Sequence, residues 1–101
     1  MKRPLQIKIS NAAAAQIETV AAWWAENRRS APGAVHEDLD RVLNPLALEP
    51  GIGTPARATT LRGVRRVTLL RVRYHLYYRV TDDSLEVLAF WHTSRGHQPD
   101  L

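Results

Sequence analysis

The chain has 101 residues, 45% hydrophobic and 24% charged, which excludes a disordered polymer and indicates one folded domain over residues 1–101. It contains no cysteine, so disulfides and thiolate metal sites are excluded, and its net charge of +4 favours an anionic partner. No apolar run approaches the roughly 20 residues of a membrane helix, and no signal peptide is evident, so we expect a cytoplasmic protein without membrane association.

The first part of the chain predicts a strand and a helix. Leu5–Ile9 alternates between apolar and polar residues, which predicts a short strand at or near a sheet edge. Ser10 stands at the N-cap position of a helix from residue 11 to about residue 27, where alanines favour the helical state. Trp23 lies about 100° from the apolar stripe of this helix, at its boundary or facing the next helix. That stripe, which we expect to pack on the sheet, is formed by Ile17, Val20, Ala21 and Trp24.

A second helix follows after a short connection, so the two helices are expected to form an antiparallel hairpin. Pro45 interrupts its pattern, and the helix either ends near Asn44 or kinks and resumes through Leu48; we favour the kink. The segment 49–55 (EPGIGTP) then stops the helix and turns the chain, and it lacks the residues of a phosphate-binding loop. The apolar positions of this helix are Val35, Leu39, Val42, Leu43 and Leu46.

The segment from Leu61 to Gly96 predicts a meander of three antiparallel strands. Residues 64–70 form the first strand, and residues 71–73 connect it to the second. One face of the second strand carries Val72, Tyr74, Leu76, Tyr78 and Val80, and the other carries Arg73, His75, Tyr77 and Arg79. After a turn at 81–84, the last strand is expected to place on one face Leu85, Val87, Ala89 and Trp91. The order is therefore β-α-α-β-β-β, an α+β fold with a helical hairpin on one face of the sheet.

Aromatic residues of the helix and meander divide into two expected groups. Those expected in the core are Trp24, Tyr74, Tyr78 and Trp91. Tyr77 shares the exposed parity of His75, which favours contact with a partner instead of burial.

Charge is distributed unevenly along the chain. Residues 50–81 contain no Asp or Glu, but they include Arg57, Arg62, Arg65, Arg66, Arg71, Arg73 and Arg79. Such a basic stretch favours RNA, DNA or an acidic protein segment as partner. The alternative is a solvated strand face whose arginines serve only solubility.

The residue types allow one enzymatic hypothesis. None of the four histidines has the spacing of a zinc motif, and we expect neither a metal nor another cofactor. A metal-independent endoribonuclease needs cations for the phosphorane and groups that exchange protons with the RNA oxygens. Although no single group stands out as both acid and base, residues of the right type are Arg73, His75, Arg79, His92 and Arg95.

Two segments carry a resemblance to a known family. They are Tyr74–Val80 (YHLYYRV) and Trp91–Gly96 (WHTSRG), and they follow a helical hairpin that ends in EPGIG. Over Leu5–Pro99 the chain resembles the ParE/RelE superfamily of toxins from type II toxin–antitoxin modules, and most of all its ParE-like branch, the plasmid stabilisation proteins. The resemblance implies the same β-α-α-β-β-β fold, and it implies a cognate antitoxin, small, acidic and helix-rich, in a hetero-oligomer with the toxin.

The resemblance implies one of two activities: RelE-like members cut mRNA in the ribosome, whereas ParE-like members inhibit DNA gyrase without being hydrolases. RelE-like nucleases use basic residues on the meander, an arginine after the last strand, and commonly a tyrosine near the C-terminus. Arg95 matches that arginine and His75 occupies a strand position where such enzymes often place a cation, but no tyrosine follows Arg95.

We therefore expect a gyrase inhibitor. The alternatives are a RelE-like, ribosome-dependent mRNA endoribonuclease and an inactive homologue that only binds an acidic antitoxin. In each case the expected partner-binding residues are Arg62, Arg65, Arg66, Arg71, Arg73, His75, Tyr77, Arg79, His92 and Arg95.

Overall fold

A computed structural model describes residues 3–101 and confirms the predicted α+β architecture. Its elements are β1 (Gln6–Ile9), α1 (Asn11–Asn27), α2 (Ala34–Leu48), the short 3-10 helix η1 (Pro50–Ile52), β2 (Thr54–Pro55), β3 (Arg65–Leu69), β4 (Tyr74–Thr81) and β5 (Ser84–His92). The two-residue strand β2 and the helix η1 are additions to the predicted order. Neither α1 nor α2 has both the length and the apolarity needed to cross a membrane.

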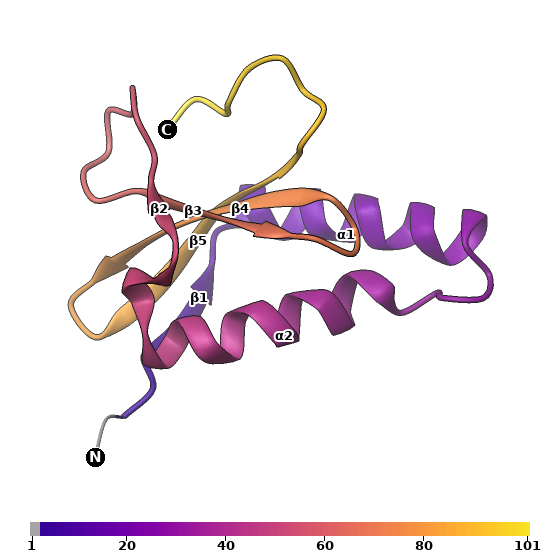
Figure 1. Cartoon of the computed structure of the whole chain (residues 1–101), viewed down its shortest axis with the longest axis horizontal. Coiled ribbons are helices and arrows are strands. Elements are labelled where there is room, and N and C mark those ends of the chain that lie inside the picture. The colour runs from indigo at the N-terminus through magenta and orange to yellow at the C-terminus, as the bar shows by residue number, and fades with distance from the viewer. Residues whose placement is uncertain (1–2) are drawn as a thin grey trace.

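The strands form one sheet in the order β1-β5-β4-β3-β2. β1 pairs in parallel with β5 and lies at the sheet edge, as predicted, and the remaining pairs are antiparallel. Figure 1 shows α1 and α2 side by side along the sheet, joined by a loop at the right of the view. The helical hairpin therefore covers one sheet face.

The start of α1 follows the prediction. The hydroxyl of Ser10 accepts a hydrogen bond from the backbone N–H of Ala13 at 3.1 Å, which satisfies one of the free amides of the first turn. Ile17 is buried, and the rest of the predicted stripe packs against the same core: Val20, Ala21 and Trp24. Trp23 lies off this stripe and is 49% exposed.

Helix α2 continues through Pro45 and ends at Leu48. Its last turn is closed by the N–H of Glu49, which donates to the carbonyl of Pro45 at 2.9 Å. The helix therefore resumes beyond the proline instead of ending near Asn44. Its predicted apolar face packs against the sheet through Val35, Leu39, Leu43 and Leu46, with Val42 partly buried.

A bulge in β5 breaks the predicted alternation of that strand. Tyr78 lies opposite Val87 and Tyr77 opposite Ala89, so Leu88 is an extra residue between the two pairs. From this point the inward and outward positions of β5 exchange: Phe90 enters the helix-covered core and Ala89 turns to the other face. The prediction that Leu85, Val87, Ala89 and Trp91 share one face was therefore wrong.

Contacts from the start of α1 hold this bulge. The N–H of Ser10 donates to the carbonyl of Val87 at 3.0 Å, and its hydroxyl donates to the carbonyl of Leu88 at 3.3 Å. The side-chain oxygen of Gln16 accepts the N–H of Phe90 at 2.7 Å. Because β1 ends opposite Val87, Ser10 and α1 thus supply partners for backbone groups of β5 at and beyond that point.

A second, smaller core covers the opposite sheet face. Tyr77 is only 2% exposed and packs with Val64 and Ala89, which corrects the prediction that it is exposed. The cover comes from the loop before β3 and from the C-terminal segment, which Figure 1 shows curving back toward that loop. The carbonyl of Leu101 accepts hydrogen bonds from the N–H groups of Thr60 and Leu61 at 2.9 and 3.0 Å. Trp91 belongs to this second core and not to the main one, where it was expected.

Candidate functional site

Of the hollows that share His92, at the end of β5, two contain most of the predicted site residues. The first, which we call the sheet hollow, has a volume of about 330 Å³ and is lined mainly by Arg66, His75, Tyr77, Trp91, His92, Arg95 and His97. The second, the tip hollow, has a volume of about 470 Å³ and is lined by Trp23, Trp24, Arg28, Arg71, Val72, Arg73, Tyr74 and His92. Both contain several cationic or ionisable side chains beside aromatic rings.

The bulge and the C-terminal segment shape the sheet hollow. Because the bulge turns Trp91 away from the main core, its ring supports the guanidinium of Arg95, 3.8 Å from the ring centroid. The indole N–H of Trp91 donates to the carbonyl of His97 at 2.8 Å, which holds the segment beyond β5 over the sheet. A cation is thus held beside His75 and Arg66, which reach the hollow from β4 and β3.

His75 lies against Thr68 on β3. The distance between its Nδ1 atom and the hydroxyl of Thr68 is 2.9 Å. Burial lowers the pKa of His75 from its ordinary value of 6.5, and the positive charge of Arg66 lowers it further. The imidazole is therefore held in its neutral form at neutral pH.

His92 has one ring nitrogen already engaged. Its Nδ1 atom accepts the N–H of Ser94 at 3.0 Å, and the hydroxyl of Ser94 lies 2.6 Å from the same atom. The neutral ring therefore carries its proton on Nε2. The ring also packs edge-on against Tyr74, with centroids 4.9 Å apart. His92 can thus donate a hydrogen bond at the boundary of the two hollows.

The tip hollow is built around the turn between β3 and β4, residues 70–73, which we call the hairpin tip. The buried carboxylate of Asp38 on α2 accepts the N–H of Val72 at 3.2 Å and a guanidinium N–H of Arg41 at 3.0 Å. Arg71 adds an ion pair of 2.8 Å with Glu37. These bonds fix the hairpin tip to the helical hairpin.

Comparison with known proteins identifies the family. Residues 7–96 match the family described as the ParE toxin of type II toxin-antitoxin systems, parDE. The chain belongs to the ParE toxin family. A solved structure described as the "Chromosomal ParDE TA system from P. aeruginosa" contains a similar chain with a TM-score of 0.70 at 22% identity, covering 89% of this chain and 97% of that one. At 22% identity, the similarity to this structure shows a shared fold. Among curated proteins, no match to the chain was found.

The ParE fold brings together only part of the predicted partner-binding set. His75, Tyr77, His92, Arg66 and Arg95 line the sheet hollow, and Arg71 and Arg73 line the tip hollow. The remaining members lie elsewhere, and two of them have other partners.

Those remaining residues are Arg62, Arg65 and Arg79. Arg65 donates to the carbonyl of Gly53 at 2.6 Å, and Arg79 pairs with its cross-strand neighbour Glu86 at 2.9 Å. Arg62 is exposed on the loop before β3. The basic stretch thus forms no single continuous face.

Sequence reasoning missed three residues of the tip hollow: Trp23, Trp24 and Arg28. The first two were assigned only packing roles. The sequence did contain a signal for this cluster: Arg28 follows Trp24 by four residues, a spacing at which an arginine side chain can pack against the tryptophan ring. Between residues 3 and 101 no group of three His, Cys, Asp or Glu side chains is arranged to hold a metal ion.

The lowered pKa of His75 predicts an effect of pH on the stability of this ParE-family chain. A histidine with a lower pKa in the folded state binds protons more readily when unfolded, so stability falls as pH drops below 6.5 toward the folded-state pKa. His75→Gln should therefore lose less free energy of unfolding than the wild type between about pH 7.5 and about pH 5. Urea unfolding at both pH values tests this, and equal losses in the two proteins would contradict it.

Proposed function

We propose that this toxin inhibits DNA gyrase by binding to it, and that a small, acidic, helix-rich antitoxin neutralises it within a hetero-oligomer. The observation that carries the proposal is the match to the ParE toxin family over residues 7–96. The family description names a toxin–antitoxin system. We propose gyrase as the target because the segments YHLYYRV and WHTSRG resemble those of the ParE-like branch, whose members inhibit gyrase.

The arrangement of cations supports binding more than RNA cleavage. Of the candidate nuclease residues, Arg79 lies four residues beyond His75 on β4, a distance of about 13 Å, and it is paired with Glu86. Arg73 lies in the neighbouring hollow. A nuclease centre needs its cations and proton-transfer groups around one phosphate, whereas a binding surface tolerates this spread.

The same surface suits an acidic antitoxin segment. Arg66 is exposed on β3 and Arg95 is exposed beyond β5, and both line the sheet hollow. Carboxylates of a partner helix or strand can pair with both guanidinium groups, since a guanidinium fork matches a carboxylate. Gyrase and antitoxin would then compete for the sheet hollow, which gives a direct route to neutralisation.

A supercoiling assay with purified toxin, gyrase and relaxed plasmid tests the proposal. The wild type should block supercoiling or trap cleaved DNA, and added antitoxin should restore activity. The double variant Arg66→Ala, Arg95→Ala should require about tenfold more toxin, because each lost exposed charge pair contributes up to about 1 kcal/mol. Arg57→Ala, an exposed arginine outside both hollows, should match the wild type. Full supercoiling at any toxin concentration would refute gyrase as the target.

A RelE-like, ribosome-dependent mRNA endoribonuclease is the second candidate, because His75, His92 and Arg95 line the same hollow. That activity would yield codon-positioned cuts ending in a 2′,3′-cyclic or 3′-phosphate, abolished by His75→Ala or Arg95→Ala. We expect ribosome-bound mRNA to remain intact. Cleavage with unaffected gyrase would establish the second candidate, and a toxin that binds antitoxin but inhibits neither target would be an inactive homologue.

A further inference from the structure

We propose that the tip hollow binds an unpaired nucleotide of a single-stranded nucleic acid, with the base against Trp23 and the phosphate between Arg28 and Arg73. This goes beyond the proposed function, since inhibition by binding gyrase requires no nucleic-acid contact. The proposal is based on an exposed aromatic surface, unneutralised cations and a fixed backbone in one hollow.

The aromatic surface comes from the end of α1. Trp23 is 49% exposed, and its ring meets Trp24 edge-on, with centroids 6.2 Å apart and planes at 73°. The guanidinium carbon of Arg28 lies 5.4 Å from the centroid of Trp23 and 5.9 Å from that of Trp24. A half-exposed tryptophan ring beside an arginine is typical of the surfaces on which proteins stack the bases of single-stranded nucleic acids.

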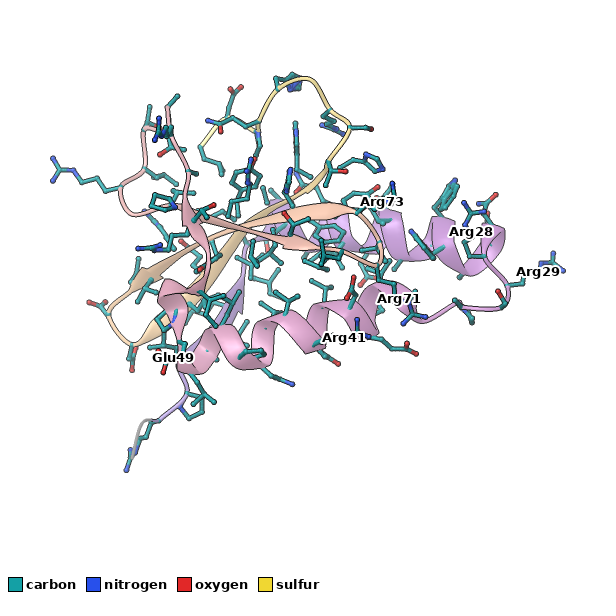
Figure 2. All side chains as sticks on the ribbon, in the orientation of Figure 1. Arg28, Arg29, Arg41, Glu49, Arg71 and Arg73 are labelled. Carbon is teal, nitrogen blue, oxygen red and sulfur yellow. The ribbon has the colours of Figure 1, made fainter. Side chains whose placement is uncertain are left out.

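The cations come from two segments that are far apart in sequence. Figure 2 shows Arg28 at the end of α1 and Arg71 and Arg73 on the hairpin tip, all on the same side of the molecule. Arg71 is paired with Glu37. Within residues 3–101, neither Arg28 nor Arg73 has a carboxylate within 4.0 Å. Two positive charges therefore remain for an anionic ligand.

The backbone that carries Arg73 is fixed in an unusual conformation. Its φ of 62° lies in the left-handed region, which favours glycine. The N–H of Arg73 donates to the carbonyl of Leu69 at 2.8 Å, and its own carbonyl accepts the N–H of Thr93 at 3.1 Å. Together with the Val72–Asp38 bond, these contacts fix the backbone of Arg73 at the edge of the hollow that this residue lines.

The combination of groups favours a single strand over other anions. A duplex keeps its bases stacked inside and offers the hollow only phosphates, whereas an acidic peptide satisfies the arginines but offers no ring to Trp23. A nucleotide supplies both, and its size suits a hollow of about 470 Å³. The Nε2–H of His92, at the rim, supplies a further donor for phosphate or base.

Direct binding to short labelled oligonucleotides tests the proposal with the full chain. Fluorescence anisotropy would compare oligothymidylate, oligouridylate, a DNA duplex and an oligoglutamate peptide of matched charge. We expect both single strands to bind more tightly than the duplex and the peptide, with affinity falling as salt rises. The tighter of the two single strands identifies DNA or RNA as the source. No gyrase is present, so the outcome is independent of the proposed function.

Matched variants locate the binding. Trp23→Ala should weaken binding about tenfold, and Trp23→Phe should retain most of it, while Ile52→Ala, another exposed apolar residue, should bind as the wild type does. Arg28→Ala and Arg73→Gly should each reduce the salt slope by about 0.7, and glycine at position 73 keeps the positive φ without strain. Arg57→Ala should change neither affinity nor slope.

Two results would overturn the proposal. One is wild-type affinity in Trp23→Ala. The other is oligoglutamate binding as tight as that of the single strands and weakened by the same variants, which would assign the hollow to an acidic peptide.

Discussion

Adding one methyl group at Gly53 is expected to lower the free energy of unfolding by about 3 kcal/mol or more. A Cβ at this position would lie 2.5 Å from the hydroxyl of Tyr78 and 2.8 Å from the carbonyl of Arg66. The N–H of Gly53 donates to that hydroxyl at 3.0 Å, and the hydroxyl donates to the carbonyl of Pro50 at 2.6 Å. Displacing Tyr78 would therefore break two hydrogen bonds, one of them buried, in addition to crowding the sheet.

Gly51→Ala is the matched control for Gly53→Ala. Gly51 lies two residues away and is exposed, and a methyl group added there would meet no atom within 4 Å. The stability of this variant should stay within about 1 kcal/mol of the wild type, because alanine only restricts the unfolded chain. Urea unfolding of both variants measures the difference. Equal stabilities would mean that the contact between the EPGIG segment and Tyr78 contributes little.

Truncating Tyr77 should cost as much as truncating its neighbour Tyr78, about 3–5 kcal/mol each. The two side chains point to opposite sheet faces, and both are buried, at 2% and 0% exposure. Tyr78 fills the main core, and Tyr77 fills the second core under the loop before β3 and the C-terminal segment. Removing either ring leaves a cavity that a rigid sheet cannot close.

Val80→Ala on the same strand provides the control for the tyrosine pair, since Val80 is 43% exposed and should lose about 1 kcal/mol at most. Equilibrium unfolding in urea gives all three values. A loss below about 1 kcal/mol for Tyr77→Ala would show that the loop and the C-terminal segment leave this face open in solution.

The local patterns of the chain predict most of its architecture. The stripe of α1, the cap at Ser10 and the alternation of β4 each depend on neighbouring residues, and each is confirmed. The helical propensity and apolar face of α2 likewise stabilise the helix more than Pro45 destabilises it. The proline ring removes one backbone hydrogen bond, but Leu43 and Leu46 on either side of it remain buried in the core.

The errors share a different physical origin, which is contact between segments distant in sequence. The bulge at Leu88 depends on Ser10 and Gln16, and no pattern within β5 contains that information. The alternation along β4 places Tyr77 on the face opposite the main core, where an exposed residue is expected. It is buried only because the loop before β3 and the C-terminal segment, both distant in sequence, cover that face. The tip hollow has the same origin, since tertiary structure alone brings Arg28 and Arg73 to the lining of one hollow.

The contact between Ser10 and Leu88, 78 residues apart, also has a consequence during translation. Helix α1 is synthesised early, but β5, the strand that it contacts, is complete only when His92 has been added. At about 5–20 residues per second, roughly 2–9 s pass between synthesis of the end of α2 at Leu48 and completion of β5 at His92, and the apolar face of the helical hairpin stays uncovered during this time. A frameshift or stop codon before Ser84 would therefore release a fragment without β5 and without the core residues Leu85, Val87 and Phe90, and we expect such a fragment to be a target for proteolysis.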